Sequence, residues 1–145
     1  KLAVLPEPMV TVAKSKNPEL VVALDLTAEW DKVSPAGSLV QGCVVVRKDF
    51  ADANSAAVAA FLEEYGTSIE TMLSDIEGTA TKIEANGIFT KAAVAAKAIP
   101  NCNVCFIEGA QMKEALAEFL NTMHGVAPAS VGGSIPGDDF YYIAE

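Results

Sequence analysis

Cys102 and Cys105 have the C-x-x-C spacing of a redox-active dithiol. Such a pair works at a helix N-terminus, which lowers the pKa of the attacking thiol. Here the pair leads into the apolar residues 103–107, which predict a strand, and the alternation of side chains along a strand would place the two sulfur atoms on opposite faces. We therefore interpret both as ordinary cysteines, and Cys43, inside an apolar run, as a small buried hydrophobic residue.

Four side chains reach the minimum number for a closed zinc site: Cys43, Cys102, Cys105 and His124. No second closely spaced ligand pair supports such a site, so zinc stays an alternative and we predict no metal. His124, the only histidine, falls near a predicted helix end, where the helix dipole favours a cation. The sequence contains no nucleophile elbow, phosphate-binding loop or dinucleotide fingerprint. We predict no cofactor and no catalytic residue.

The turn Pro6-Glu7-Pro8 separates an apolar run from residues 9–16, which we predict to form a helix because proline is favoured at a helix start. If the apolar run is a strand, the turn lies where open α/β sheets bind ligands and where helix-start N–H groups offer hydrogen bonds. Glu7 would then accept from a ligand amine or hydroxyl. The alternative is that Glu7 only caps the helix dipole, and spacing alone favours this cap.

Apolar runs and helical spacings alternate along the chain. The predicted strands are residues 2–5, 20–26, 39–47 and 103–107. The predicted helices are about 9–16, 57–73, 77–85, 91–98 and 110–123. This order indicates an α/β class with a mostly parallel sheet flanked by helices. The length suits one domain, so we assign residues 1–145 to a single α/β domain.

The composition narrows the function classes. Of the 145 residues, 51% are hydrophobic and 20% are charged, which excludes disorder as a description of the whole chain. A net charge of -9 argues against a nucleic-acid partner, which needs a positive surface. No apolar run approaches the roughly 20 residues that span a bilayer. Because the chain begins with Lys1 inside a predicted strand, we expect a processed product or a fragment.

The order of three stretches resembles the C-terminal portion of ABC-transporter solute-binding proteins, in the group related to the nitrate, sulfonate, taurine and thiamine-pyrimidine-precursor binding proteins. The stretches are residues 3–8 followed by Thr11, residues 42–50 followed by a helix with residues 61–69, and residues 128–133 through 139–142. The resemblance covers essentially the whole chain and depends on the order of the motifs.

The resemblance implies a periplasmic-binding-protein-like lobe that captures a small organic solute in an interlobe cleft and delivers it to an ABC permease. It implies binding without catalysis, and an extracytoplasmic location, either periplasmic or as a cell-surface lipoprotein. Membrane association is expected only through an anchor that precedes Lys1. The implied ligand-binding residues are Glu7, Pro8 and Thr11, with Gln41 and Gly42 as weaker candidates and Trp30 as an aromatic wall.

The sequence departs from this family in its first turn. Many relatives carry an aromatic residue where Pro6 stands, so stacking on a ring is lost there. The second wall of the cleft is expected from the other lobe. For Trp30, packing beneath a loop is an equal alternative.

Two other functions stay open. An enzyme of pyrimidine-precursor biosynthesis on a related fold would need a nucleophile, histidine or metal cluster near Glu7, whereas His124 is expected elsewhere. A self-associating interaction domain would use the apolar surface that an isolated lobe exposes, and a homo-oligomer would follow from it.

Overall fold

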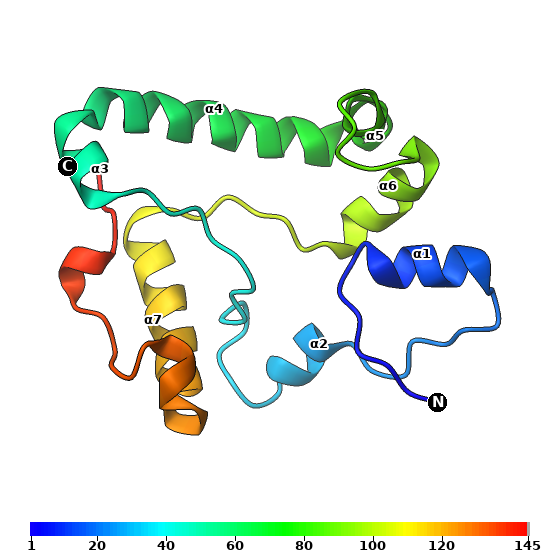
Figure 1. Ribbon diagram of the computed structural model, residues 1–145, viewed down its shortest axis with the longest axis horizontal. Coiled ribbons are helices and arrows are strands. Elements are labelled where there is room, and N and C mark those ends of the chain that lie inside the picture. The colour runs from blue at the N-terminus through cyan, green and yellow to red at the C-terminus, as the bar shows by residue number, and fades with distance from the viewer. Residues whose placement is uncertain (145) are drawn as a thin grey trace. The chain divides into compact units, whose positions relative to one another are not determined.

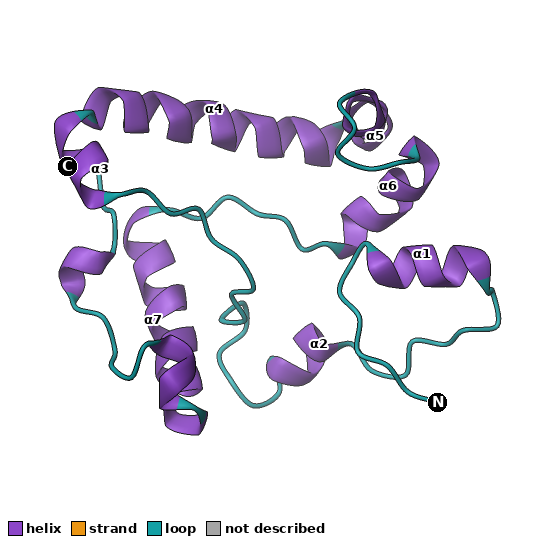
Figure 2. Ribbon diagram, viewed as in Figure 1, coloured by secondary structure: helices purple, strands orange, loops and turns teal. Residues whose placement is uncertain are grey.

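The computed structural model describes residues 1–144, and all regular elements in that range are helices (Figure 2). The α-helices are α1 (Met9–Lys16), α2 (Leu26–Trp30), α3 (Lys48–Ala53), α4 (Ser55–Ser74), α5 (Ile76–Ala85), α6 (Ala92–Ala98) and α7 (Gly109–Val126). Three short 3-10 helices are η1 (Ile99–Asn101), η2 (Pro128–Val131) and η3 (Asp138–Phe140). In this part of the chain, no helix has the length and apolar character needed to cross a membrane.

The predicted α/β class with a mostly parallel sheet is wrong, because residues 1–144 contain no strand. Three of the four predicted strands, residues 2–5, 39–47 and 103–107, have no regular secondary structure, and Asn103 has a positive φ of 50°. Within residues 20–26, Asp25 Oδ1 accepts hydrogen bonds from Thr27 N at 2.9 Å and from Ala28 N at 3.3 Å, which begins α2 inside the predicted strand. A strand exists only beside a second strand, and the apolar pattern of one segment cannot supply that neighbour.

The helix predictions are confirmed, with ends that differ by no more than three residues. The sequence features that mark the ends of these helices lie within a few residues of each end. Helix α1 begins directly after Pro8 and ends at Asn17, which has an extended backbone and precedes a proline. Asp75 Oδ1 accepts from Gly78 N at 2.9 Å and caps the start of α5.

The chain divides into two compact units. Unit 1 comprises Lys1–Val21 and Ala56–Phe106, and unit 2 comprises Val22–Ser55 and Ile107–Glu145. The assignment of residues 1–145 to one domain stays a prediction.

The core of unit 1 lies between α5 and α6 (Figure 1). Ala80 of α5 is fully buried against Ala95 of α6 and Ile99 of η1. Larger side chains close around these three: Met72, Ile76, Ile83 and Phe89. Small residues at the centre allow the two helix backbones to approach each other, and the larger ones fill the rim.

One extended segment of unit 1 packs on α4. Cys102, Val104 and Phe106 are half-buried and alternate with exposed residues. Helix α4 continues without interruption through Gly66, where a Cβ atom would meet Phe106 Cδ1 at 3.2 Å. The Tyr65 and Phe106 rings meet edge to face, with centroids 6.0 Å apart. The absence of a side chain at Gly66 therefore allows the Phe106 ring to approach the backbone of α4 closely.

In unit 2, short elements lie against α7. The C-terminal turn is held by Lys113, whose Nζ lies 2.7 Å from Asp138 Oδ1 and 5.8 Å from the centroid of the Tyr141 ring. Tyr141 is buried, and Phe140 meets it edge to face. Asp138 thus forms an ion pair with a side chain of α7.

Candidate functional site

Glu7 is engaged by its own helix. Thr11 N donates a hydrogen bond to Glu7 Oε2 at 3.1 Å, and both residues are half-buried. The Pro6 carbonyl accepts from Met9 N at 2.8 Å. The structure therefore brings Glu7, Pro8 and Thr11 together at the start of α1, in the capping arrangement that spacing alone favoured. The expected strand before this turn is absent among the described residues, so the sheet-edge position predicted for Glu7 is wrong.

Cys102 lies near this turn in unit 1. Burial raises the pKa of the Cys102 thiol, and the negative charge of Glu7 raises it further. The thiol donates a hydrogen bond to the Ala98 carbonyl, with an Sγ to O distance of 3.3 Å. Cys105 is exposed. The strand expected to place the two sulfur atoms on opposite faces is absent among the described residues. This environment is the reverse of the one that activates a redox dithiol.

Cys43 is exposed, so its predicted burial is wrong. Among residues 1–144, no group of three or more His, Cys, Asp and Glu side chains is placed to hold a metal ion.

Two candidate ligand residues, Trp30 and Gln41, lie on one surface depression in unit 2. The depression is open and has a volume of about 470 Å³. Its lining is mostly apolar: Leu26, Glu29, Trp30, Val33, Leu39 and Gln41. An apolar wall with a few polar groups is the usual composition of a small-molecule site.

Trp30 is held in place on two sides. Its Nε1 donates to Ser38 Oγ at 2.9 Å, and Ser38, which is 3% exposed, donates to the Pro35 carbonyl at 2.6 Å. The rings of Trp30 and Phe119 of α7 are 5.8 Å apart and inclined at 48°. Trp30 thus packs against a helix and a loop while one part of it lines the depression. The role of Trp30 as an aromatic wall of a ligand site stays a prediction.

Glu29 is the one charged side chain among the six lining residues. Its Oε1 lies 2.7 Å from Lys32 Nζ, one turn further along the chain. Both side chains are well exposed, so water screens this pair and its contribution to stability is small.

Gly42 follows Gln41 and is exposed, with open space where a Cβ would stand. Gln41 and Gly42 therefore belong to unit 2 together with Trp30, whereas Glu7, Pro8 and Thr11 belong to unit 1. Sequence reasoning missed Glu29 and Ser38. The bond from Trp30 to Ser38 spans eight residues of irregular chain and leaves no periodic signal.

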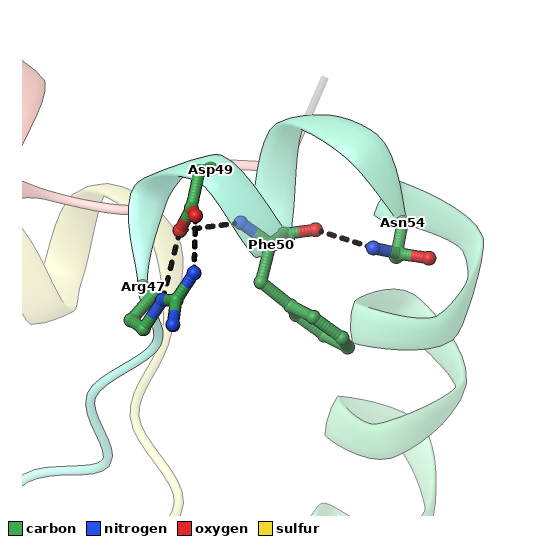
Figure 3. Close-up of polar contacts among 4 residues, drawn as sticks. All are labelled: Arg47, Asp49, Phe50 and Asn54. Atoms are coloured by element: carbon green, nitrogen blue, oxygen red, sulfur yellow. Dashed lines mark hydrogen bonds and ion pairs between the residues drawn. The ribbon is translucent and has the colours of Figure 1, made fainter.

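Residues 39–47 lead into α3, and side-chain hydrogen bonds of Asp49 and Asn54 hold this helix (Figure 3). Arg47 Nε donates to Asp49 Oδ1 at 3.0 Å, and a second guanidinium nitrogen contacts Asp49 Oδ2. Asp49 Oδ1 also accepts from Phe50 N at 3.0 Å, and Asn54 Nδ2 donates to the Phe50 carbonyl at 3.0 Å. The guanidinium holds the pKa of Asp49 below its usual value, and Asp49 raises the pKa of Arg47.

No family model, curated protein or solved structure matches the chain. The resemblance to solute-binding proteins therefore stays a prediction.

Proposed function

We propose that this protein is the C-terminal part of the solute-binding component of an extracytoplasmic ABC importer, which delivers its solute to the permease. It binds and does not catalyse. The observation that carries the proposal is the depression on which Trp30 and Gln41, two residues implied by the resemblance, lie together.

The chemistry of the depression suits a flat organic solute. The Trp30 ring offers a face on which a heteroaromatic ring can stack. The Gln41 amide can both donate and accept hydrogen bonds, and Leu26 and Leu39 add apolar walls. The depression is open, whereas a tight site buries most of its ligand's surface. We therefore expect this chain alone to bind weakly, with a dissociation constant of about 1 mM, and the second lobe to supply the rest.

The charge of the lining favours one of the solute classes in the related group. Nitrate and sulfonates are anions, and anion sites use arginine or lysine. The charged lining residue here is Glu29, which is paired with Lys32, and none of the six lining residues is a cation, so the lining favours a neutral ring such as an aminopyrimidine over an anion.

Intrinsic fluorescence tests this proposal directly, because Trp30 is the only tryptophan. We expect an aminopyrimidine to change the emission of the chain saturably, and taurine to leave it unchanged. Replacement Gln41→Leu should weaken binding about fivefold, the loss of one hydrogen bond of about 1 kcal/mol.

Gln111→Leu is the matched control, since Gln111 is the other glutamine and lies exposed on α7 of the same unit. It should bind as the unchanged chain does. A linear response equal to that of free N-acetyltryptophanamide, or equal binding of taurine, would contradict the proposal.

A further inference from the structure

The turn after α5 requires a glycine (Figure 1). Gly87 has a φ of 67°, a left-handed conformation that other residues rarely adopt. Its N–H donates to the Glu84 carbonyl at 3.0 Å, and Ile88 N donates to the Ile83 carbonyl at 3.0 Å. These two bonds form the Schellman motif that ends many helices. The end of α5 therefore places a glycine directly after Asn86.

The pair Asn86-Gly87 can react without any other group of the protein. The Gly87 nitrogen attacks the side-chain amide carbon of Asn86, and glycine has no Cβ to hinder the approach. A bond forms between Gly87 N and Asn86 Cγ, the bond between Cγ and Nδ2 breaks, and ammonia leaves with the proton of the Gly87 N–H. Water then opens the succinimide ring at either carbonyl, which gives aspartate or isoaspartate. Both residues are exposed, so water reaches them.

In the folded chain, hydrogen bonds hold both reacting groups. The attacking nitrogen, Gly87 N, donates to Glu84 within the Schellman motif, and the leaving nitrogen, Asn86 Nδ2, donates to the Lys82 carbonyl at 2.8 Å. Gly87 N must turn from Glu84 toward Asn86 Cγ before it attacks, so the motif has to open first. Helix ends open at a smaller free-energy cost than the core of a fold. Opening of this turn therefore sets the rate of the reaction.

Two other asparagines provide a comparison within the chain. Asn54, Asn86 and Asn101 each stand at a helix end and donate from Nδ2 to the carbonyl four residues earlier, at 3.0, 2.8 and 3.2 Å. All three are exposed. Asn54 precedes Ser55 and Asn101 precedes Cys102, so Asn86 alone is followed by glycine. The three share their side-chain hydrogen bond and differ in the residue that follows.

We propose that Asn86 is a site of spontaneous deamidation, that opening of the Schellman motif sets its rate, and that its conversion loosens the contact between α5 and α6. An ionised aspartate cannot donate to the Lys82 carbonyl and brings a negative charge to the helix C-terminus, which the helix dipole disfavours. Isoaspartate also adds one methylene to the main chain of the turn. This turn leads to Phe89, which packs on the buried core of unit 1, so a longer turn displaces Phe89 from that core.

Peptide mapping of the stored whole chain by mass spectrometry tests the site. At pH 8 we expect the amide of Asn86 to become an acid at least about tenfold faster than those of Asn54 and Asn101, because glycine alone leaves the approach open. Asn86→Gln should stop the change, since its longer side chain would have to close a less favourable six-membered ring. In denaturing urea the reaction at Asn86 should be about tenfold faster, because no motif has to open. Equal rates at the three asparagines would overturn the site, and a rate unaffected by urea would overturn its control by the motif.

Hydrogen–deuterium exchange measures the consequence for the fold. Asn86→Asp should speed the exchange of amides in α5 and α6 at least about threefold. Asn54→Asp is the matched control, since it removes the same type of bond at the end of α3 in unit 2, and it should leave exchange in α5 and α6 unchanged. Equal exchange of α5 and α6 in the two variants would overturn the loosening. None of these measurements depends on solute binding.

Discussion

In the α5–α6 pair, Ala80 is fully buried against Ala95, whereas in residues 39–47 Val45 keeps 79% of its surface exposed. The helices form their backbone hydrogen bonds internally, so a neighbouring helix is needed only to cover side chains. The extended segment makes no such bonds by itself and needs a partner for both its backbone and its side chains. The helical core of unit 1 therefore satisfies its own backbone hydrogen bonds, whereas residues 41–46 form none within the described part of the chain.

The largest expected effect comes from truncating the core. Ile99→Ala removes a buried side chain of η1 and should lower the free energy of unfolding by about 2–4 kcal/mol. Val45→Ala, measured at low concentration, should change it by less than about 0.5 kcal/mol. Urea unfolding followed by circular dichroism measures both. Equal losses would break the distinction between the two regions.

Two helical glycines differ in what surrounds them: Gly66 of α4 faces the Phe106 ring, whereas Gly125 of α7 faces open space. Gly66→Leu must displace the Phe106 ring and should cost about 1–3 kcal/mol. Gly125→Leu in α7 meets open space and should stabilise the chain by up to about 0.8 kcal/mol through helix propensity. Thermal and urea unfolding compare the two variants. A stabilising Gly66→Leu would mean that the contact between Phe106 and α4 is not formed.

A smaller expected effect concerns the reactivity of the Cys102 and Cys105 thiols. Cys102 is half-buried and its thiol pKa is raised, so it should react with iodoacetamide at pH 8 at least tenfold more slowly than Cys105. Glu7→Gln removes a negative charge beside it and should lower the pKa of Cys102, which speeds the reaction. Glu19→Gln, at an exposed position, is the control. Mass spectrometry of the alkylated peptides gives the rates, and equal rates for the two cysteines would contradict the alternating burial of this segment.

The smallest effect concerns the end of residues 39–47. Because Arg47 lowers the pKa of Asp49, the stabilisation by this pair is present above the pKa of the unfolded carboxyl and is lost as pH falls through the lowered folded value. Arg47→Gln should raise the pKa of Asp49 toward its usual value, and Lys48→Gln, which affects the pair with Asp52, should not. Carboxyl NMR titration reads this shift. An unchanged pKa of Asp49 in the Arg47→Gln variant would mean that the ion pair does not form in solution.

Helices α1, α4, α5, α6 and α7 could be predicted from the sequence because the signals that mark them are local. Helices α2 and α3 could not, because helices of five and six residues are too short to show a periodic pattern. Pro8 and Asn17 mark the two ends of α1, and apolar spacing marks α4 and α7. The strands could not, because pairing depends on a second segment that no single run of residues specifies.

The candidate site could be predicted only in part. The Glu7 cap follows from its position before a helix. The shared depression of Trp30 and Gln41 depends on Ser38 and Phe119, which hold the ring from eight residues away and from a distant helix. No spacing in the sequence predicts these contacts.

Hydrogen–deuterium exchange tests the contrast between the α5–α6 core and residues 39–47 most directly. We expect the amides of α5 and α6 to be protected, and those of residues 41–46, which form no hydrogen bond within the described residues, to exchange freely. Protection of residues 41–46 equal to that of α5 and α6 would contradict the account.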